Sequence, residues 1–170
     1  MTNRRRLIVM RHAKAEPFAA TDHARVLTEG GRRAATEAGS HLASTGAVPE
    51  YALVSTAVRA VNTWEAVALG SGSAAEPHLD GALYTGSPDV VLEALRAVPT
   101  DVEDLIVIGH NPTVAHLAHL VDDGHGEPAA VEKMLQGYPA GALTVLEVRV
   151  PWSELGPECA RLTDFHVGRG

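Results

Sequence analysis

The sequence predicts an α/β fold, a three-layer sandwich in which a mostly parallel sheet is flanked by helices and ends in a C-terminal hairpin. Short, wholly apolar runs alternate along the chain with longer stretches of helical spacing. Such runs are typical of strands buried on both faces, as in parallel sheets that helices cover on both sides. The C-terminal part instead carries two strand patterns in succession, which favours a hairpin.

Four runs are predicted to be strands of the parallel part, namely 7–10, 51–54, 74–79 and 105–108. The third contains Pro77, which is typical of an edge strand. Helical spacing predicts helices from Thr28 to Gly46 and over 58–69, 88–98, 112–121 and 129–136. Three of them have N-terminal signals, which are Thr28, Ser87 followed by Pro88, and Asn111 followed by Pro112.

The hairpin is predicted to join strand 142–150 to strand 159–167, with Gly156 and Pro157 in the turn. The second half of the first strand alternates between apolar and charged residues. This alternation predicts that one face of the strand is exposed to solvent.

Length and composition bound the classes of protein that fit. A chain of 170 residues that is 45% hydrophobic suits one domain over 1–170. The net charge of -7 disfavours nucleic acid or an anionic membrane as a general partner. The single cysteine, Cys159, excludes an internal disulfide. Only four apolar residues follow Arg4–Arg6, too few for a signal peptide, so the expected location is the cytoplasm.

Polar residues follow three of the predicted buried strands at the point where each ends. They are Arg11-His12, the turn from Ser55 to Arg59, and Gly109-His110-Asn111. Right-handed crossovers keep such strands parallel, so all three ends should share one edge of the sheet, where ligands bind in α/β folds. Two arginines, two histidines and two helix N-termini then converge, which favours a tetrahedral oxyanion such as phosphate.

These motifs resemble the histidine phosphatase superfamily, which has the phosphoglycerate mutase-like fold. The resemblance rests on RHA at 11–13, STAVRAVNT at 55–63 and GHNP at 109–112, and covers residues 7 to about 167. The short chain, the D-x-x-R-x-L-T element at 22–28 and YPAGALTVLE at 138–147 resemble its SixA-type phosphohistidine phosphatase branch. One departure is Ala13, where much of the superfamily has glycine.

The resemblance assigns catalytic roles that the chemistry also supports. His12 would attack phosphorus as a neutral imidazole and carry the phosphoryl group. Arg11, Arg59 and His110, with Asn111 in the phosphate site, would hold the phosphoryl oxygens. No metal or cofactor is expected. Taken one at a time, Arg59 also fits a helix-surface arginine and His110 a turn histidine.

The proton donor is left open by the sequence. Asp80 is the nearest match to the place of the acid in larger members, whereas Glu16, Glu76 and Asp22 are alternatives. Asn111 stands directly after the second histidine, where other members have an acid. The SixA-type branch also lacks a clear acid. A phosphoramidate depends less on an enzymic acid than an alkyl phosphate ester does, because its leaving nitrogen can be protonated before cleavage.

The predicted partner is therefore a protein that carries phosphohistidine. Two alternatives remain, a small phosphate ester as substrate, or a phosphoprotein-binding module without turnover, to which Ala13 would be a clue. A metal site at His116 and His119 is disfavoured, because the two-histidine zinc motif needs a spacing of four with a glutamate between.

Overall fold

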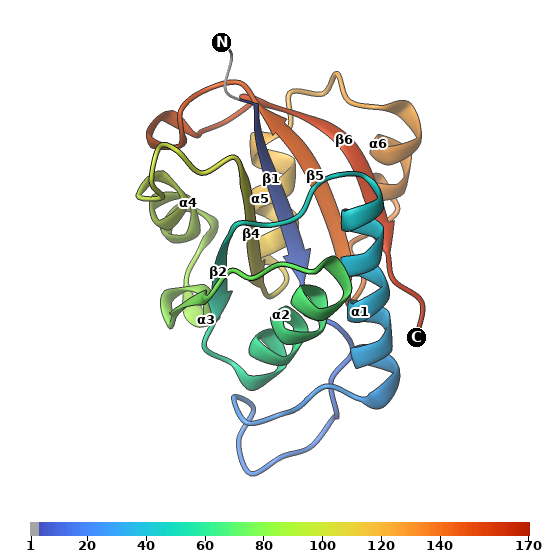
Figure 1. Cartoon of the computed structure of the whole chain (residues 1–170). Coiled ribbons are helices and arrows are strands. Elements are labelled where there is room, and N and C mark those ends of the chain that lie inside the picture. The colour runs from blue at the N-terminus through green and yellow to red at the C-terminus, as the bar shows by residue number, and fades with distance from the viewer. Residues whose placement is uncertain (1–3) are drawn as a thin grey trace.

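The computed structural model describes residues 4–170, which form a six-stranded sheet between two layers of helices (Figure 1). The strand order is β3-β2-β4-β1-β5-β6. The parallel strands are β1 (Arg5–Arg11), β2 (Tyr51–Ser55), β3 (Pro77–Asp80) and β4 (Asp104–Gly109). The antiparallel hairpin is β5 (Ala142–Val148) and β6 (Ala160–Val167). The predicted mostly parallel sheet with a C-terminal hairpin is confirmed.

Each face of the sheet has its own apolar core. One face packs against α1 (Glu29–Ser44) and α2 (Val58–Ser71). The other packs against α3 (Ala82–Thr85), α4 (Pro88–Arg96), α5 (Thr113–Val121) and α6 (Pro128–Leu135), together with a 3-10 turn at Trp152–Glu154. Within residues 4–170 no helix has both the length and the apolar character needed to cross a membrane.

The central strand β1 shows why its apolar run forms a buried strand. Leu7 and Val9 belong to the core on the α4–α6 side, whereas Ile8 and Met10 belong to the core beneath α1 and α2. All four side chains have no exposed surface. Burial of each contributes about 1.5–3 kcal/mol, which stabilises a strand with no polar face.

Two helix starts differ in how well the sequence predicts them. Thr28 caps α1 as predicted, because its Oγ1 accepts a hydrogen bond from the Gly31 N–H at 2.9 Å. The prediction that Asn111 caps the next helix was wrong. Pro112 is the N-cap of α5, and the Asn111 amide instead donates to the Tyr138 carbonyl at 2.8 Å.

The prediction that one face of the first hairpin strand is solvated is confirmed for its second half only, where the side chains of Glu147 and Arg149 are 42% and 56% exposed. β5 lies between β1 and β6, and helices cover both faces of the sheet there, so all its residues except Glu147 are buried. Arg149, one of the alternating charged residues, lies beyond the end of the strand. The short helix α3 was not predicted at all. β3 is an edge strand, as expected, but it covers Pro77–Asp80 and not 74–79.

The parallel strands bring several loops together at the lower end of the molecule in Figure 1, which we call the carboxyl edge. Arg11 at the end of β1 lies beside Gly109 at the end of β4. Ser55 at the end of β2 lies beside Asp80 at the end of β3. The motifs that follow these strands therefore meet at one edge.

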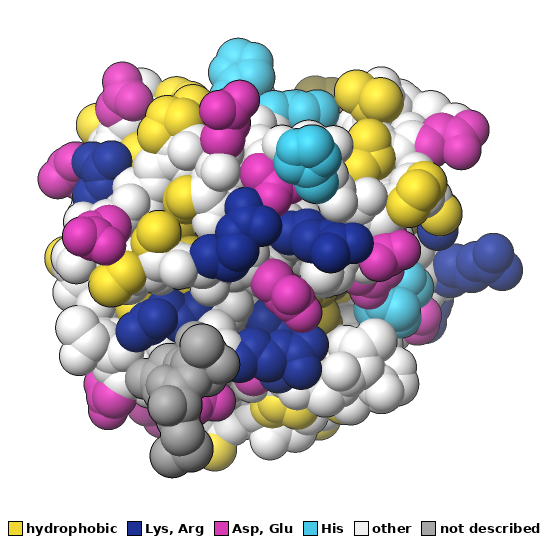
Figure 2. Space-filling view, turned by 90° about the horizontal axis from the view of Figure 1, so that it is seen from above, with side chains coloured by type: hydrophobic (Ala, Val, Ile, Leu, Met, Phe, Trp, Pro, Cys, Tyr) yellow, Lys and Arg dark blue, Asp and Glu magenta, His cyan; other side chains and the backbone are white. Residues whose placement is uncertain are grey.

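The opposite end, seen from above in Figure 2, carries lysine and arginine side chains interleaved with acidic ones. Several of these cations are paired within the chain. The ion pairs are Arg4–Glu147, Arg6–Asp104 and Arg149–Asp123, with nitrogen–oxygen distances of 3.2, 2.6 and 2.5 Å. This end is therefore a mixed surface and not a cationic one.

The close crossing of α1 and α2 depends on glycine. A Cβ placed on Gly39 would lie 2.3 Å from the Val67 carbonyl oxygen, so the helices have to separate to accommodate it. We expect Gly39→Ala to lower the free energy of unfolding by about 1–3 kcal/mol, measured by urea titration, because overpacking outweighs the gain in helix propensity. Gly30→Ala is the control, because its nearest neighbour would be 3.8 Å away. Equal stability of the two variants would contradict the crossing as described.

Candidate active site

The structure brings His12, Arg59 and His110 to a common point at the carboxyl edge. The Arg59 Nε lies 3.3 Å from His12 Nε2, and its Nη2 lies 3.4 Å from His110 Nδ1. The two imidazole rings are 5.2 Å apart between centroids. His12 follows β1, Arg59 lies in the first turn of α2, and His110 follows β4, so three segments far apart in the sequence form one cluster.

His12 is held by its backbone from both sides. Its N–H donates to the Gly109 carbonyl at 3.0 Å, and its carbonyl accepts from the Gly141 N–H at 2.9 Å. The ring Nδ1 lies 2.8 Å from the Ala13 carbonyl, which can only accept. Nδ1 therefore carries the hydrogen, and Nε2 presents its lone pair toward Arg59.

The pKa of His12 is lowered to about 4, mainly because the ring is buried. The Ala13 carbonyl acts in the opposite direction, and the positive charges of Arg59 and Arg11 lower the pKa further. At neutral pH the imidazole is therefore uncharged and nucleophilic at Nε2.

His110 is also kept neutral. Burial lowers its pKa to about 4, and His12 and Arg59 contribute in the same direction. Because the Arg59 Nη2 can only donate, Nδ1 of His110 accepts and Nε2 donates to the Ser55 hydroxyl at 2.8 Å. The Ser55 hydroxyl also accepts from the Ala57 N–H at 3.2 Å, which fixes it in the turn between β2 and α2.

Asp22 is an ionised carboxylate beside the cluster. It accepts from Arg59 Nη2 at 3.1 Å, from Arg25 Nη1 at 2.9 Å and from the Tyr84 hydroxyl at 2.5 Å. The hydrogen bonds from Tyr84, Arg25 and Arg59 hold the pKa of this carboxyl well below its usual range. Asp22 therefore lacks the proton that a general acid has to supply from this position.

Arg11 and Asn111 meet at the loop before β5. Arg11 Nη1 and the Asn111 amide both donate to the Tyr138 carbonyl, at 3.1 and 2.8 Å. Arg11 Nε is buried and has no hydrogen-bond partner among residues 4–170. An unpaired buried donor costs free energy that an oxygen ligand recovers, so this N–H is suited to bind an anion.

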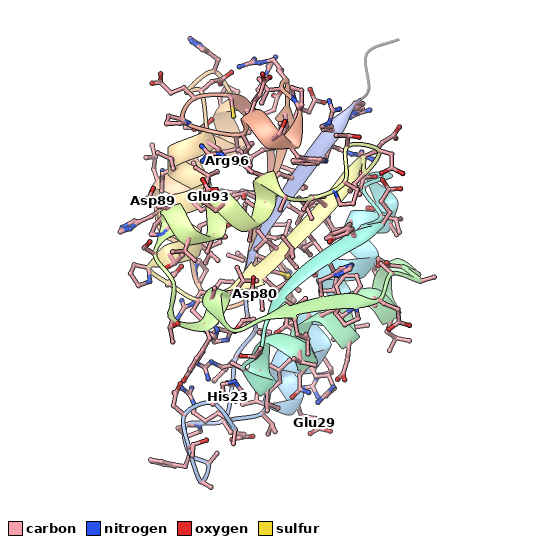
Figure 3. All side chains as sticks on the ribbon, turned by 90° about the vertical axis from the view of Figure 1, so that its left-hand side faces the viewer. His23, Glu29, Asp80, Asp89, Glu93 and Arg96 are labelled. Carbon is pink, nitrogen blue, oxygen red and sulfur yellow. The ribbon has the colours of Figure 1, made fainter. Side chains whose placement is uncertain are left out.

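Asp80 lies at the end of β3 and is labelled in Figure 3 together with His23 of the loop before α1. Its Oδ1 accepts from the Ala82 N–H at 2.9 Å and so supports the first turn of α3. Within residues 4–170 it makes no hydrogen bond to His12, Arg59 or His110. Asp80 as the acid stays a prediction.

The backbone after His12 accommodates Ala13, which stands where much of the superfamily has glycine. Among residues 4–170 only Glu158 has a positive φ apart from glycines, so the backbone at Ala13 does not need a glycine conformation. The Ala13 side chain is fully buried, and its N–H donates to the Thr63 hydroxyl at 3.0 Å. The residue therefore fixes the start of the loop after His12 without distorting it.

Tyr84 was missed by sequence reasoning, whereas Ser55 and Thr63 were identified only as parts of the motif at 55–63 and were given no role. Tyr84 had no signal, because it lies in a helix of four residues that is too short to show periodicity. Ser55 begins the turn that was predicted to reach this edge, but its hydroxyl was given no contact. Thr63 lies one turn after Arg59 on α2 and donates to the Arg59 carbonyl at 2.7 Å.

Together these groups make an arrangement that is chemically suited to a tetrahedral oxyanion. Two guanidinium groups supply donors and positive charge, and a neutral imidazole nitrogen faces the same space. The first N–H of α2, at Val58, is already bonded to the His23 carbonyl at 3.0 Å, so the side chains and not this amide make the site.

No protein-family model matches the chain, but proteins and solved structures similar to it are known. The uncharacterized protein Rv1276c of Mycobacterium tuberculosis is 36% identical over 162 residues, covering 94% of this chain and all of that protein.

Among solved structures, a candidate phosphohistidine phosphatase SixA from Nakamurella multipartitia is 33% identical, with a TM-score of 0.82 over 97% of this chain and 96% of that one. The protein histidine phosphatase SixA complexed with tungstate matches with a TM-score of 0.78 and 22% identity, over 95% and 96% of the two chains. The chain thus belongs to the histidine phosphatase superfamily, within its SixA-type branch.

Proposed function

We propose that the protein is a phosphatase that removes the phosphoryl group from phosphohistidine on another protein, through a covalent phosphohistidine at His12. The observation that carries the proposal is the neutral His12 imidazole, whose Nε2 lone pair faces a guanidinium. Two of the similar structures are described as SixA phosphohistidine phosphatases, and a related one holds tungstate, a tetrahedral oxyanion. These likenesses support a phosphoryl group as the ligand.

In the first step, Nε2 of His12 attacks phosphorus, and the bond from phosphorus to the leaving nitrogen breaks. The Arg59 Nε–H, which meets Nε2 in the free site, has to move to a phosphoryl oxygen when substrate arrives. Arg11, Arg59 and His110 offset the charge on the three equatorial oxygens. The leaving imidazole, protonated beforehand from solvent at its other ring nitrogen, keeps the bonding electron pair and departs as a neutral ring.

In the second step, water attacks phosphorus on phospho-His12 and the Nε2–phosphorus bond breaks. His12 leaves as a neutral imidazole because burial and the neighbouring arginines disfavour its protonated form. Inorganic phosphate is released. The positive charge needed in both steps comes from the side chains of the site, so we propose no metal ion.

The state of the nearby carboxylates favours a phosphoramidate over an alkyl ester. Asp22 is ionised, and Asp80 is hydrogen-bonded within its own turn. An alkoxide leaving group needs an acid, whereas the nitrogen of phosphohistidine can be protonated before it leaves. A site without a strong acid therefore suits phosphohistidine best.

The covalent step is tested by trapping. Incubation with ³²P-labelled phosphohistidine protein and a rapid alkaline quench should leave label on His12 that is stable to base and lost in acid. His12→Ala should retain no label and lose about 10³-fold or more in rate. Added EDTA should leave the rate unchanged. Label on no residue, or loss of turnover on chelation, would favour attack by metal-bound water.

The ionisation of His12 can be measured by NMR titration of its ring. We expect a midpoint near pH 4 instead of 6.5, and a higher midpoint in Arg59→Gln because one cation is removed. Arg33→Gln, at an exposed position of α1, is the control. In the unfolded chain the His12 ring takes up its proton near pH 6.5, but in the folded protein only near pH 4. The free energy of unfolding should therefore fall as the pH drops from 6.5 through 4. A midpoint at 6.5 would remove the reason for a neutral nucleophile.

The leaving group provides a separate test of the substrate class. Without strong acid assistance, rates should fall steeply from phosphohistidine and aryl phosphate to alkyl and sugar phosphates, measured as kcat/KM. Asp80→Asn should slow an alkyl ester more than phosphohistidine if Asp80 is the acid, and both equally if it only supports its turn. A sugar phosphate hydrolysed as fast as phosphohistidine protein would contradict the proposed substrate.

A further inference from the structure

A groove of about 480 Å³ lies between the end of α6 and the end of β6. Its walls include two cations, a glutamine and three apolar residues, which are Lys133, Arg169, Gln136, Pro139, Phe165 and Val167. None of the residues that line the groove is acidic. It is separate from the cluster of His12, Arg59 and His110.

The groove opens at the same edge of the sheet as His12. Val167 at the end of β6 pairs with Ala142, and the next residue of β5, Leu143, pairs with Met10 of β1. Two strand spacings therefore separate the groove from the end of β1, about 10 Å. The loop that links them also touches the site, because the Tyr138 carbonyl accepts from Arg11 and the Gly141 N–H donates to His12.

The charge of the groove differs from that of the opposite end of the molecule. Within the part of the chain that the structure describes, neither Lys133 nor Arg169 forms an ion pair. The histidine in the wall, His166, contacts Glu37 of α1 at 2.8 Å. At the opposite end, by contrast, Arg4 and Arg161 are each paired with a glutamate. The groove is thus a local positive site on a chain of net charge -7.

We propose that this groove docks an acidic segment of the protein that carries the phosphohistidine, a proposal that rests on the proposed function. The two unpaired cations meet carboxylates of the segment, and Pro139, Phe165 and the 39% exposed Val167 contact an apolar residue between them. An extended chain covers about 10 Å in three residues, so the acidic residues lie three or more positions from the phosphohistidine.

The experiment uses three synthetic peptides, each with one phosphohistidine prepared with phosphoramidate. Positions three to six on either side of it carry aspartate in the first peptide, asparagine in the second and lysine in the third. Phosphate release is measured as kcat/KM for the wild type and for Lys133→Glu with Arg169→Glu. The matched control is Arg4→Glu with Arg161→Glu, which makes the same change of net charge at the opposite end.

For the wild type we expect kcat/KM on the aspartate peptide to be roughly threefold to tenfold higher than on the asparagine peptide, which is the effect of two exposed charge pairs. The groove variant should lose this preference and favour the lysine peptide. The control variant should keep the wild-type order. All three proteins should hydrolyse an aryl phosphate with kcat/KM values within about twofold of one another, because this small substrate does not reach the groove. Equal rates on this substrate also show that the variants are folded.

Two results would overturn the docking proposal alone: equal rates of the wild type on all three peptides, or loss of the aspartate preference in the control variant as well as in the groove variant. Turnover of the aryl phosphate with no turnover of any peptide would instead overturn the proposed function, and the docking proposal with it.

Discussion

The placement of the whole site depends on one strand, β1, which is paired on both sides and buried on both faces. Its four central side chains have no exposed surface, so the strand has little freedom to shift or twist. Its end is therefore a fixed point, and His12 is bonded there to Gly109 on one side and Gly141 on the other. The proposed attack of His12 on phosphorus along one line requires such a fixed backbone.

Burial also explains how positive and neutral groups coexist in the site. A histidine in water beside two arginines would still be protonated in part at pH 6.5, but desolvation removes the charged form of both His12 and His110. The arginines keep their charge because of their high intrinsic pKa. The proposed function thus separates two roles, in which the guanidinium groups bind the anion and the neutral imidazole supplies the electron pair.

The parts that could be predicted from the sequence follow strong physical rules. Four consecutive apolar residues form a strand with two buried faces, and parallel strands end at one edge of the sheet. These two rules were enough to predict that Arg59 and His110 lie close to His12. The parts that could not be predicted depend on tertiary contacts. Tyr84 lies in a helix of one turn, and the Asn111 amide has a carbonyl to bind only because the loop at Tyr138 folds back beside it.

The prediction for the first hairpin strand held only where its sequence alternates. Glu147 and Arg149 are exposed as the alternation indicates, whereas residues 142–146, which do not alternate, are buried on both faces. Glu147 is tolerated in β5 because it lies near the open end of the sheet and pairs with Arg4. Burial of a strand is thus a property of its place in the sheet, and local sequence reports it only in part.

The carboxylate of Asp22 has a consequence for what happens after the reaction. Arg59 is already paired with an anion of its own chain, and Tyr84 and Arg25 hold that anion in place. An incoming dianion shares the positive charge of Arg59 with this carboxylate, which lowers its net binding free energy. Inorganic phosphate brings no further contacts that offset this loss. In the proposed reaction, Asp22 would therefore favour the release of inorganic phosphate.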